Sequence, residues 1–160
     1  MTQEERLIQK DRMRFIKNKL PANLAILAIL FDVFYFVSIY QSDVRDYYYT
    51  MMIGASILYN LVFMLACFLS SEGLKNYKMG YAWLIGILGI GQIVRIFVIP
   101  AQAHATELKK VGQVMGNSQY TFVVGCLILS AVCCLAAAVI GGIRSRTLKQ
   151  YLAELETKSA

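Results

Sequence analysis

Two ionisable residues, Asp32 and Arg95, lie inside long apolar stretches of this 160-residue sequence. Two amides accompany them, because Gln92 precedes Arg95 by three residues and Asn60 lies near the middle of another apolar stretch. Charges are rare in the hydrocarbon layer of a membrane, and those found there are usually paired or functional. Residues three apart share one face of a helix, so Gln92 and Arg95 should point the same way. These four residues are the first candidate site.

The four residues allow three interpretations. In the first, Asp32 and Arg95 form an ion pair inside the membrane, helped by Gln92, that fixes how two helices pack. An unpaired charge at that depth would cost about 2.5–3.5 kcal/mol, although Arg95 could also extend toward the outer interface. In the second, Asp32 is a proton or cation site, and Arg95 tunes it or contacts an anionic substrate. In the third, the residues contact a partner subunit. We favour the structural pair.

The other side chains offer little catalytic or ligand-binding chemistry. The four cysteines lie in apolar stretches without C-x-x-C spacing and are expected to serve in packing; they are Cys67, Cys126, Cys133 and Cys134. The one histidine, His104, has too few neighbouring ligands to complete a metal site. No phosphate-binding loop, G-x-S-x-G or H-E-x-x-H motif occurs. We therefore expect no enzymatic activity, no catalytic residue, no cofactor and no metal site.

The candidate site requires membrane helices to position it. The apolar fraction of 58% exceeds the usual 45–50% or so of soluble chains, and only 16% of the residues are charged, which argues against a water-soluble enzyme. Four segments of 19 to 23 residues hold the apolar excess, and about 20 residues suffice to cross a membrane. They span residues 20–40, 51–69, 79–99 and 121–143. No small-residue cleavage site follows the first, which we interpret as a retained helix. The sequence predicts an all-α integral membrane four-helix bundle, one domain over residues 1–160.

Basic residues are distributed unequally between the two predicted sides of the membrane. Twelve of the 16 Lys and Arg residues fall in the N-terminal arm, the loop after the second segment, and the C-terminal tail. Only Arg45, Lys109 and Lys110 fall in the other loops. Positively charged loops stay in the cytoplasm, so both termini are predicted to be cytoplasmic. Short loops without an N-glycosylation acceptor on the outer side favour a bacterial cytoplasmic membrane.

The two ends of the chain are predicted to form amphipathic cytoplasmic helices. In the arm at residues 1–19, apolar residues recur among basic ones. In the tail at residues 144–160, apolar residues follow helical spacing; they are Leu148, Tyr151, Leu152 and Leu155. Either helix could rest on anionic lipid or dock on a cytoplasmic partner. We favour lipid contact for both, although Glu154 and Glu156 make a protein partner slightly more favoured for the tail than for the arm.

Small residues recur at every fourth position of the last apolar segment. They are Cys126, Ser130, Cys134, Ala138 and Gly142. Such a pattern lets another helix approach closely, and that helix can belong to this chain, to a second copy or to a foreign protein. We favour packing within the chain.

These features favour an accessory protein. The core of a four-helix bundle is filled by side chains, so a channel or carrier built from this chain would have to be an oligomer. The main hypothesis is a non-enzymatic accessory, scaffolding or regulatory subunit of a larger membrane complex, with a transporter as the first choice. A sensor or assembly factor would show the same features. The alternative is a homo-oligomeric carrier or channel that uses the four polar residues. Expected partners are membrane lipids and another integral membrane protein or a second copy. Nucleic acid is not expected, because most of the aromatic residues lie within the apolar segments.

Overall fold

Four long helices form the body of the protein. A computed structural model describes residues 18–39, 50–105, 107–108, 112–113 and 115–159. The long helices are α2 (Lys19–Ile39), α4 (Thr50–Lys75), α5 (Met79–Val98) and α7 (Asn117–Ser159). Within these described ranges, four helices are long and apolar enough to cross a membrane, which confirms this part of the prediction. The expected N-terminal amphipathic helix lies outside the described residues.

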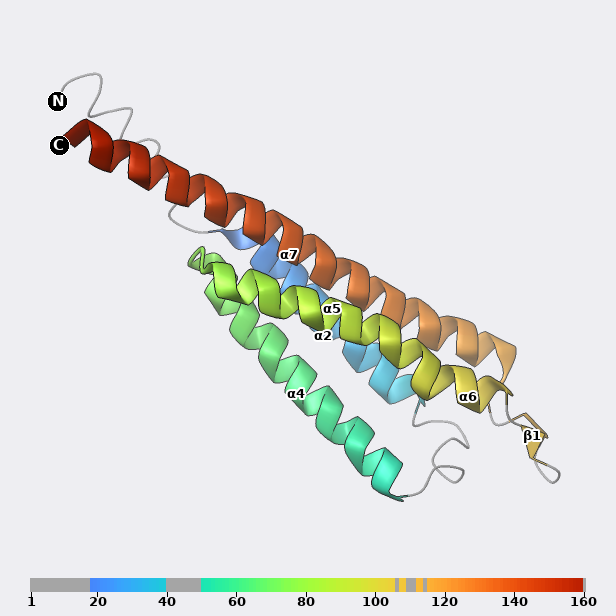
Figure 1. Cartoon of the computed structure of the whole chain (residues 1–160). Coiled ribbons are helices and arrows are strands. Elements are labelled where there is room, and N and C mark those ends of the chain that lie inside the picture. Colours follow the sequence, from blue (N-terminus) through green and yellow to red (C-terminus); the bar gives the residue numbers. More distant parts are fainter. Residues whose placement is uncertain (1–17, 40–49, 106, 109–111, 114, 160) are drawn as a thin grey trace.

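The helices pack as a bundle in which sequence neighbours run in opposite directions. In Figure 1, α7 lies along α2 and α5, and α4 covers the other side of these two helices. Asn18 ties three of the helices together, because its backbone N donates to Lys75 O (3.2 Å) and its Oδ1 accepts from Arg144 Nη1 (2.8 Å). One turn further in, Ser71 Oγ of α4 donates to the backbone O of Ala22 in α2 (3.1 Å). These contacts set the register of α2 against α4 and α7.

The interior has two apolar clusters, one toward each end of the bundle. The cluster nearer the start of α2 includes Phe63, Leu74 and Ile85, and the cluster nearer the end of α2 includes Tyr35 and Leu127. Outside this interior, large apolar side chains are exposed on every long helix, as expected for helices surrounded by lipid. The candidate polar residues lie between the two clusters.

The C-terminal tail is a continuation of α7. Helix α7 continues without a break from the last predicted membrane segment to Ser159, so residues 144–159 extend the same helix. Figure 1 shows this part of α7 projecting past the ends of α2, α4 and α5. No proline interrupts the sequence between Ile143 and Ser159, and the strong helix formers there (Leu, Lys, Gln, Glu and Ala) allow the helix to propagate.

The helix is interrupted at Ile99, between α5 and the short helix that follows it. A proline lacks the backbone N–H and clashes with the preceding turn, yet it is tolerated at a helix start. Accordingly α5 ends at Val98, and a short helix, α6 (Pro100–Ala105), begins at Pro100. Two-residue strands follow, β1 (Glu107–Leu108) and β2 (Gly112–Gln113), which pair antiparallel. This small pairing is the one departure from an all-helical fold among the described residues.

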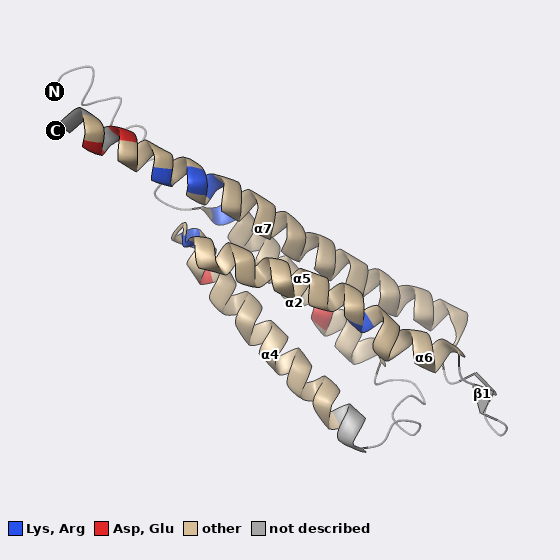
Figure 2. Cartoon of the chain, in the orientation of Figure 1, with Lys and Arg blue, Asp and Glu red and all other residues tan. Residues whose placement is uncertain are grey.

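Charged side chains gather at one end of the bundle. In Figure 2, nearly all Lys and Arg residues of the described helices lie at the end where α2 begins and α7 ends. Arg95 is the exception among them, since it is buried within the bundle. Asp32 forms an ion pair with Arg95 there.

Candidate functional site

Asp32 and Arg95 meet inside the bundle. Oδ1 of Asp32 on α2 accepts a hydrogen bond from Arg95 Nη1 of α5 at 2.9 Å, which makes the two residues an ion pair. The same Oδ1 accepts a second hydrogen bond from Gln92 Nε2, also at 2.9 Å. Asp32 and Gln92 are fully buried, and Arg95 is 7% exposed. Because Gln92 and Arg95 are one helical turn apart, α5 presents both donors to one carboxylate oxygen.

Two tyrosine rings flank the guanidinium of Arg95. Its Cζ lies 4.2 Å from the ring centroid of Tyr35 and 4.9 Å from that of Tyr59. A desolvated cation over an aromatic face gains about 2 kcal/mol, so the rings stabilise the charge together with Asp32. Sequence reasoning missed both rings. The signal was available for Tyr35, which is three residues after Asp32 and therefore on the same face of α2.

Asn60 lies near this site without joining its hydrogen bonds. The contact between Ser71 and Ala22 sets α4 antiparallel to α2, and ten residues further along α2 this register places Asn60 close to the level of Asp32. Asn60 is 1% exposed, and no described residue forms a hydrogen bond with its Oδ1 or Nδ2. The sequence placed Asn60 in the polar set, and the structure brings only the other three residues into contact.

One polar atom in each of the three hydrogen-bonded side chains has no hydrogen-bond partner among the described residues. These atoms are Asp32 Oδ2, Gln92 Oε1 and Arg95 Nη2. A buried polar atom without a hydrogen bond costs about 1–3 kcal/mol, so these atoms could bind water, an ion or a polar ligand group. The cluster thus contains both an ion pair between two helices and unused hydrogen-bonding capacity.

A cavity of about 290 Å³ lies between α4 and α5 beside Arg95. Its polar lining comes from Ser56, Tyr59 and Arg95, and apolar side chains line the rest. A side chain at Gly91 would reach within 2.8 Å of the Tyr59 hydroxyl, so the absence of one lets Tyr59 lie close to α5. The cavity therefore gives small molecules a place next to the buried cation.

The small residues of α7 lie in contacts within the chain. Ser130 Oγ donates to the backbone O of Ala28 in α2 at 3.0 Å. A Cβ added to Gly89 of α5 would lie 3.0 Å from the Cβ of Cys134, and one added to Gly86 would lie 3.4 Å from that of Ala138. Cys126 is 6% exposed, and Gly142 packs near Met79. The stripe thus holds α7 close to α2 and α5.

The cysteines and the histidine pack against other side chains of the protein. All four cysteines are free and buried. His104 stacks on the ring of Tyr120 with centroids 4.3 Å apart, and its Nδ1 lies 3.3 Å from the backbone O of Met115. Within the described part of the chain, no group of three His, Cys, Asp or Glu residues could hold a metal ion.

Comparisons with protein-family models, curated proteins and solved structures find no match to this chain. Function is therefore inferred from its residues and their geometry.

Proposed function

We propose that this chain is a non-enzymatic accessory, scaffolding or regulatory subunit of a larger membrane complex, with a transporter as the first choice of partner. It would reside in a bacterial cytoplasmic membrane with both termini in the cytoplasm. The asymmetry of Lys and Arg supports this orientation, because positively charged segments stay on the cytoplasmic side.

The observation that carries the proposal is the projecting part of α7. This segment is continuous with a membrane-crossing helix. A partner that displaces the end of α7 would therefore displace the part of the same helix that packs in the bundle. Leu152 is 49% exposed, and Leu148 lies one turn before it on the same face. An exposed apolar stripe on a helix is suited to docking against a partner's groove or helix.

The buried polar cluster suits a structural role in such a subunit. The ion pair joins α2 to α5, and Asp32 receives both of its described hydrogen bonds from α5. A polar pair in an apolar interior favours one helix register over others, because sliding either helix would leave charges unpaired. Such a pair would keep the bundle, and the helix that projects from it, in a single arrangement.

The proposal is tested by co-purification of the tagged chain from its native membrane in mild detergent. Leu152→Glu places a charge in the apolar stripe and should abolish recovery of the partner. Gln150→Glu places the same charge about 200° around the helix and should leave recovery unchanged. Equal recovery with both variants would show that the stripe is not the docking surface.

A second candidate function is a homo-oligomeric carrier or channel that uses Asp32, Asn60, Gln92 and Arg95. The specific observation in its favour is the set of unpartnered polar atoms beside the cavity at Arg95. In that case Asp32→Asn should accumulate to normal levels and lose proton or small-ion flux in liposomes. A scaffold should instead lose stability with this substitution and show no flux in either form.

A further inference from the structure

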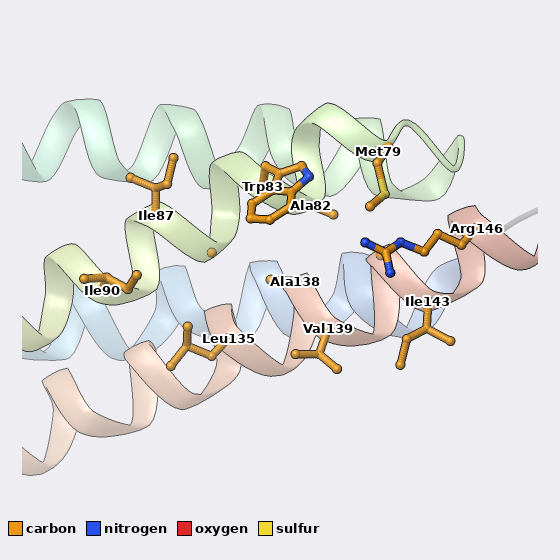
Figure 3. A pocket seen from close by; sticks show the side chains of 12 residues that line it. Met79, Ala82, Trp83, Ile87, Ile90, Leu135, Ala138, Val139, Ile143 and Arg146 are labelled. Atoms are coloured by element: carbon orange, nitrogen blue, oxygen red, sulfur yellow. The ribbon is translucent and has the colours of Figure 1, made fainter.

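A second cavity is a groove between α5 and α7 near the end of the bundle where α5 begins. It has a volume of about 400 Å³ and an almost wholly apolar lining. Its floor is formed where small residues bring the helices together, since Gly86 lies against Ala138. Its walls are large exposed side chains, among them Trp83, Ile87 and Val139 (Figure 3). Small residues flanked by large ones therefore produce a groove along the outer surface of the bundle.

The length of the groove matches one leaflet of a membrane. Its lining runs from Leu135 to Arg146 on α7 and from Met79 to Ile90 on α5. The eleven steps between the first and last of these residues, at 1.5 Å each, give about 16 Å, roughly half of a hydrocarbon core about 30 Å thick. A membrane-crossing helix of a partner would use the whole thickness. A single acyl chain, in contrast, occupies one leaflet.

The open end of the groove is positively charged. Figure 3 shows the Arg146 side chain at this end, next to Met79. No described residue accepts a hydrogen bond from its guanidinium. Lys78 directly precedes Met79 and is exposed, and Lys149 is exposed three residues after Arg146 on the same face of α7. Guanidinium groups bind phosphate in a bidentate manner, so this end is suited to an anionic headgroup.

We propose that the α5–α7 groove binds one molecule of an anionic phospholipid, with an acyl chain along Ile87 and Val139 and the phosphate on Arg146. In the proposed orientation this lipid belongs to the cytoplasmic leaflet, where anionic headgroups attract basic residues. The assignment of the leaflet rests on the proposed orientation. Binding itself does not, so the lipid site and the accessory role can fail separately.

Two matched pairs of variants separate the acyl chain from the headgroup. Val139→Phe fills the groove. Its control, Val132→Phe, makes the same change seven residues earlier on α7 and outside the groove, at a position of similar exposure (55%, against 61% at Val139). Arg146→Gln removes the charge at the open end, whereas Lys19→Gln removes an exposed charge at the start of α2. Ile87→Phe, on the opposite wall, serves as a second filling variant should Val139→Phe fail to fold.

Native mass spectrometry of the full chain in neutral detergent, titrated with dioleoyl phosphatidylglycerol or dioleoyl phosphatidylcholine, tests the proposal. The wild type should bind one phosphatidylglycerol in preference to phosphatidylcholine. Arg146→Gln should weaken phosphatidylglycerol binding about fivefold, the equivalent of roughly 1 kcal/mol, and remove the preference. Val139→Phe should weaken both lipids, and the two controls should match the wild type. Unchanged lipid binding by both Val139→Phe and Ile87→Phe would overturn the proposal. It would also be overturned if these groove-filling variants released a second protein chain from the wild-type complex rather than a lipid.

Discussion

Replacement of Asp32 by Asn should destabilise the protein strongly. The substitution preserves the shape of the side chain and leaves an oxygen that can still accept from Gln92 and Arg95. It removes the negative charge, however, and Arg95 cannot lose its own charge by deprotonation. The result is a buried cation that is 7% exposed and whose counter-charge is gone.

The size of this effect follows from the environment of Arg95. Removal of one partner of a buried ion pair costs about 3–5 kcal/mol. The rings of Tyr35 and Tyr59 remain in place and reduce the loss, so we expect a value near the lower limit, about 3 kcal/mol. At about 2–4 °C per kcal/mol for a chain of this size, the melting temperature should fall by roughly 6–12 °C.

The assay is thermal unfolding of the purified protein in detergent, followed by size-exclusion chromatography. Glu72→Gln is the matched control, because it makes the same chemical change in the surface ion pair between Glu72 and Lys75, whose side chains are 52% and 37% exposed. Exposed pairs contribute about 0–1 kcal/mol, so this control should melt close to the wild type.

A double variant tests the reasoning itself. Asp32→Asn combined with Arg95→Gln leaves two neutral amides and no buried charge, so it should melt higher than Asp32→Asn alone. The exchanged pair, Asp32→Arg with Arg95→Asp, should also melt at a higher temperature than Asp32→Asn, although below the wild type. An Asp32→Asn protein that melts with the wild type, or a double variant less stable than the single one, would refute the electrostatic explanation.

Other parts of the structure give three more predictions. Ser130→Leu and Cys134→Leu should each prevent recovery of folded protein, because the larger side chains would collide with Ala28 and Gly89. The control Val132→Leu, at an exposed position of α7, should fold normally. Equal recovery of all three variants would contradict the packing of α7. Tyr59→Leu should lower the melting temperature more than Tyr59→Phe, by the equivalent of about 1–2 kcal/mol, because only phenylalanine keeps an aromatic face over Arg95; equal losses would remove the cation–π contribution. In intact cells, an impermeant maleimide should label Asn117→Cys and not Ala153→Cys, against a low background from the buried native cysteines; the reverse pattern would overturn the proposed orientation.

The sequence predicted the positions of the membrane helices well, because an uncharged apolar run of about 20 residues matches the thickness of a membrane and is longer than most buried helices of soluble proteins. The ends of α2 and α5 fall within one residue of the predicted segments. The extension of α4 to Lys75 was not predicted, because it lies beyond the apolar residues that marked the segment. A helix was predicted for the tail, but its unbroken continuation from the last apolar segment was not. Helix formers without a proline were the available signal in the tail, whereas Ser70, Ser71 and Gly73 gave no such signal at the end of α4.

The candidate site was predictable in part. Asp32 and Arg95 were expected to meet because both lie at a similar depth in helices that run in the same direction, and Gln92 shares a face with Arg95. The contribution of Tyr59 depends on how α4 packs against α5 and on the space left at Gly91, which a single sequence does not specify. The same dependence on packing explains why Asn60 was assigned to the set yet makes no hydrogen bond with its other members.

The most direct test of the accessory role is the native mass of the tagged full chain, purified from its own membrane in mild detergent, together with the identity of every co-purifying protein. The proposal predicts a stoichiometric complex with a larger integral membrane protein. A homo-oligomer without any other protein would contradict it and favour the carrier or channel that uses Asp32.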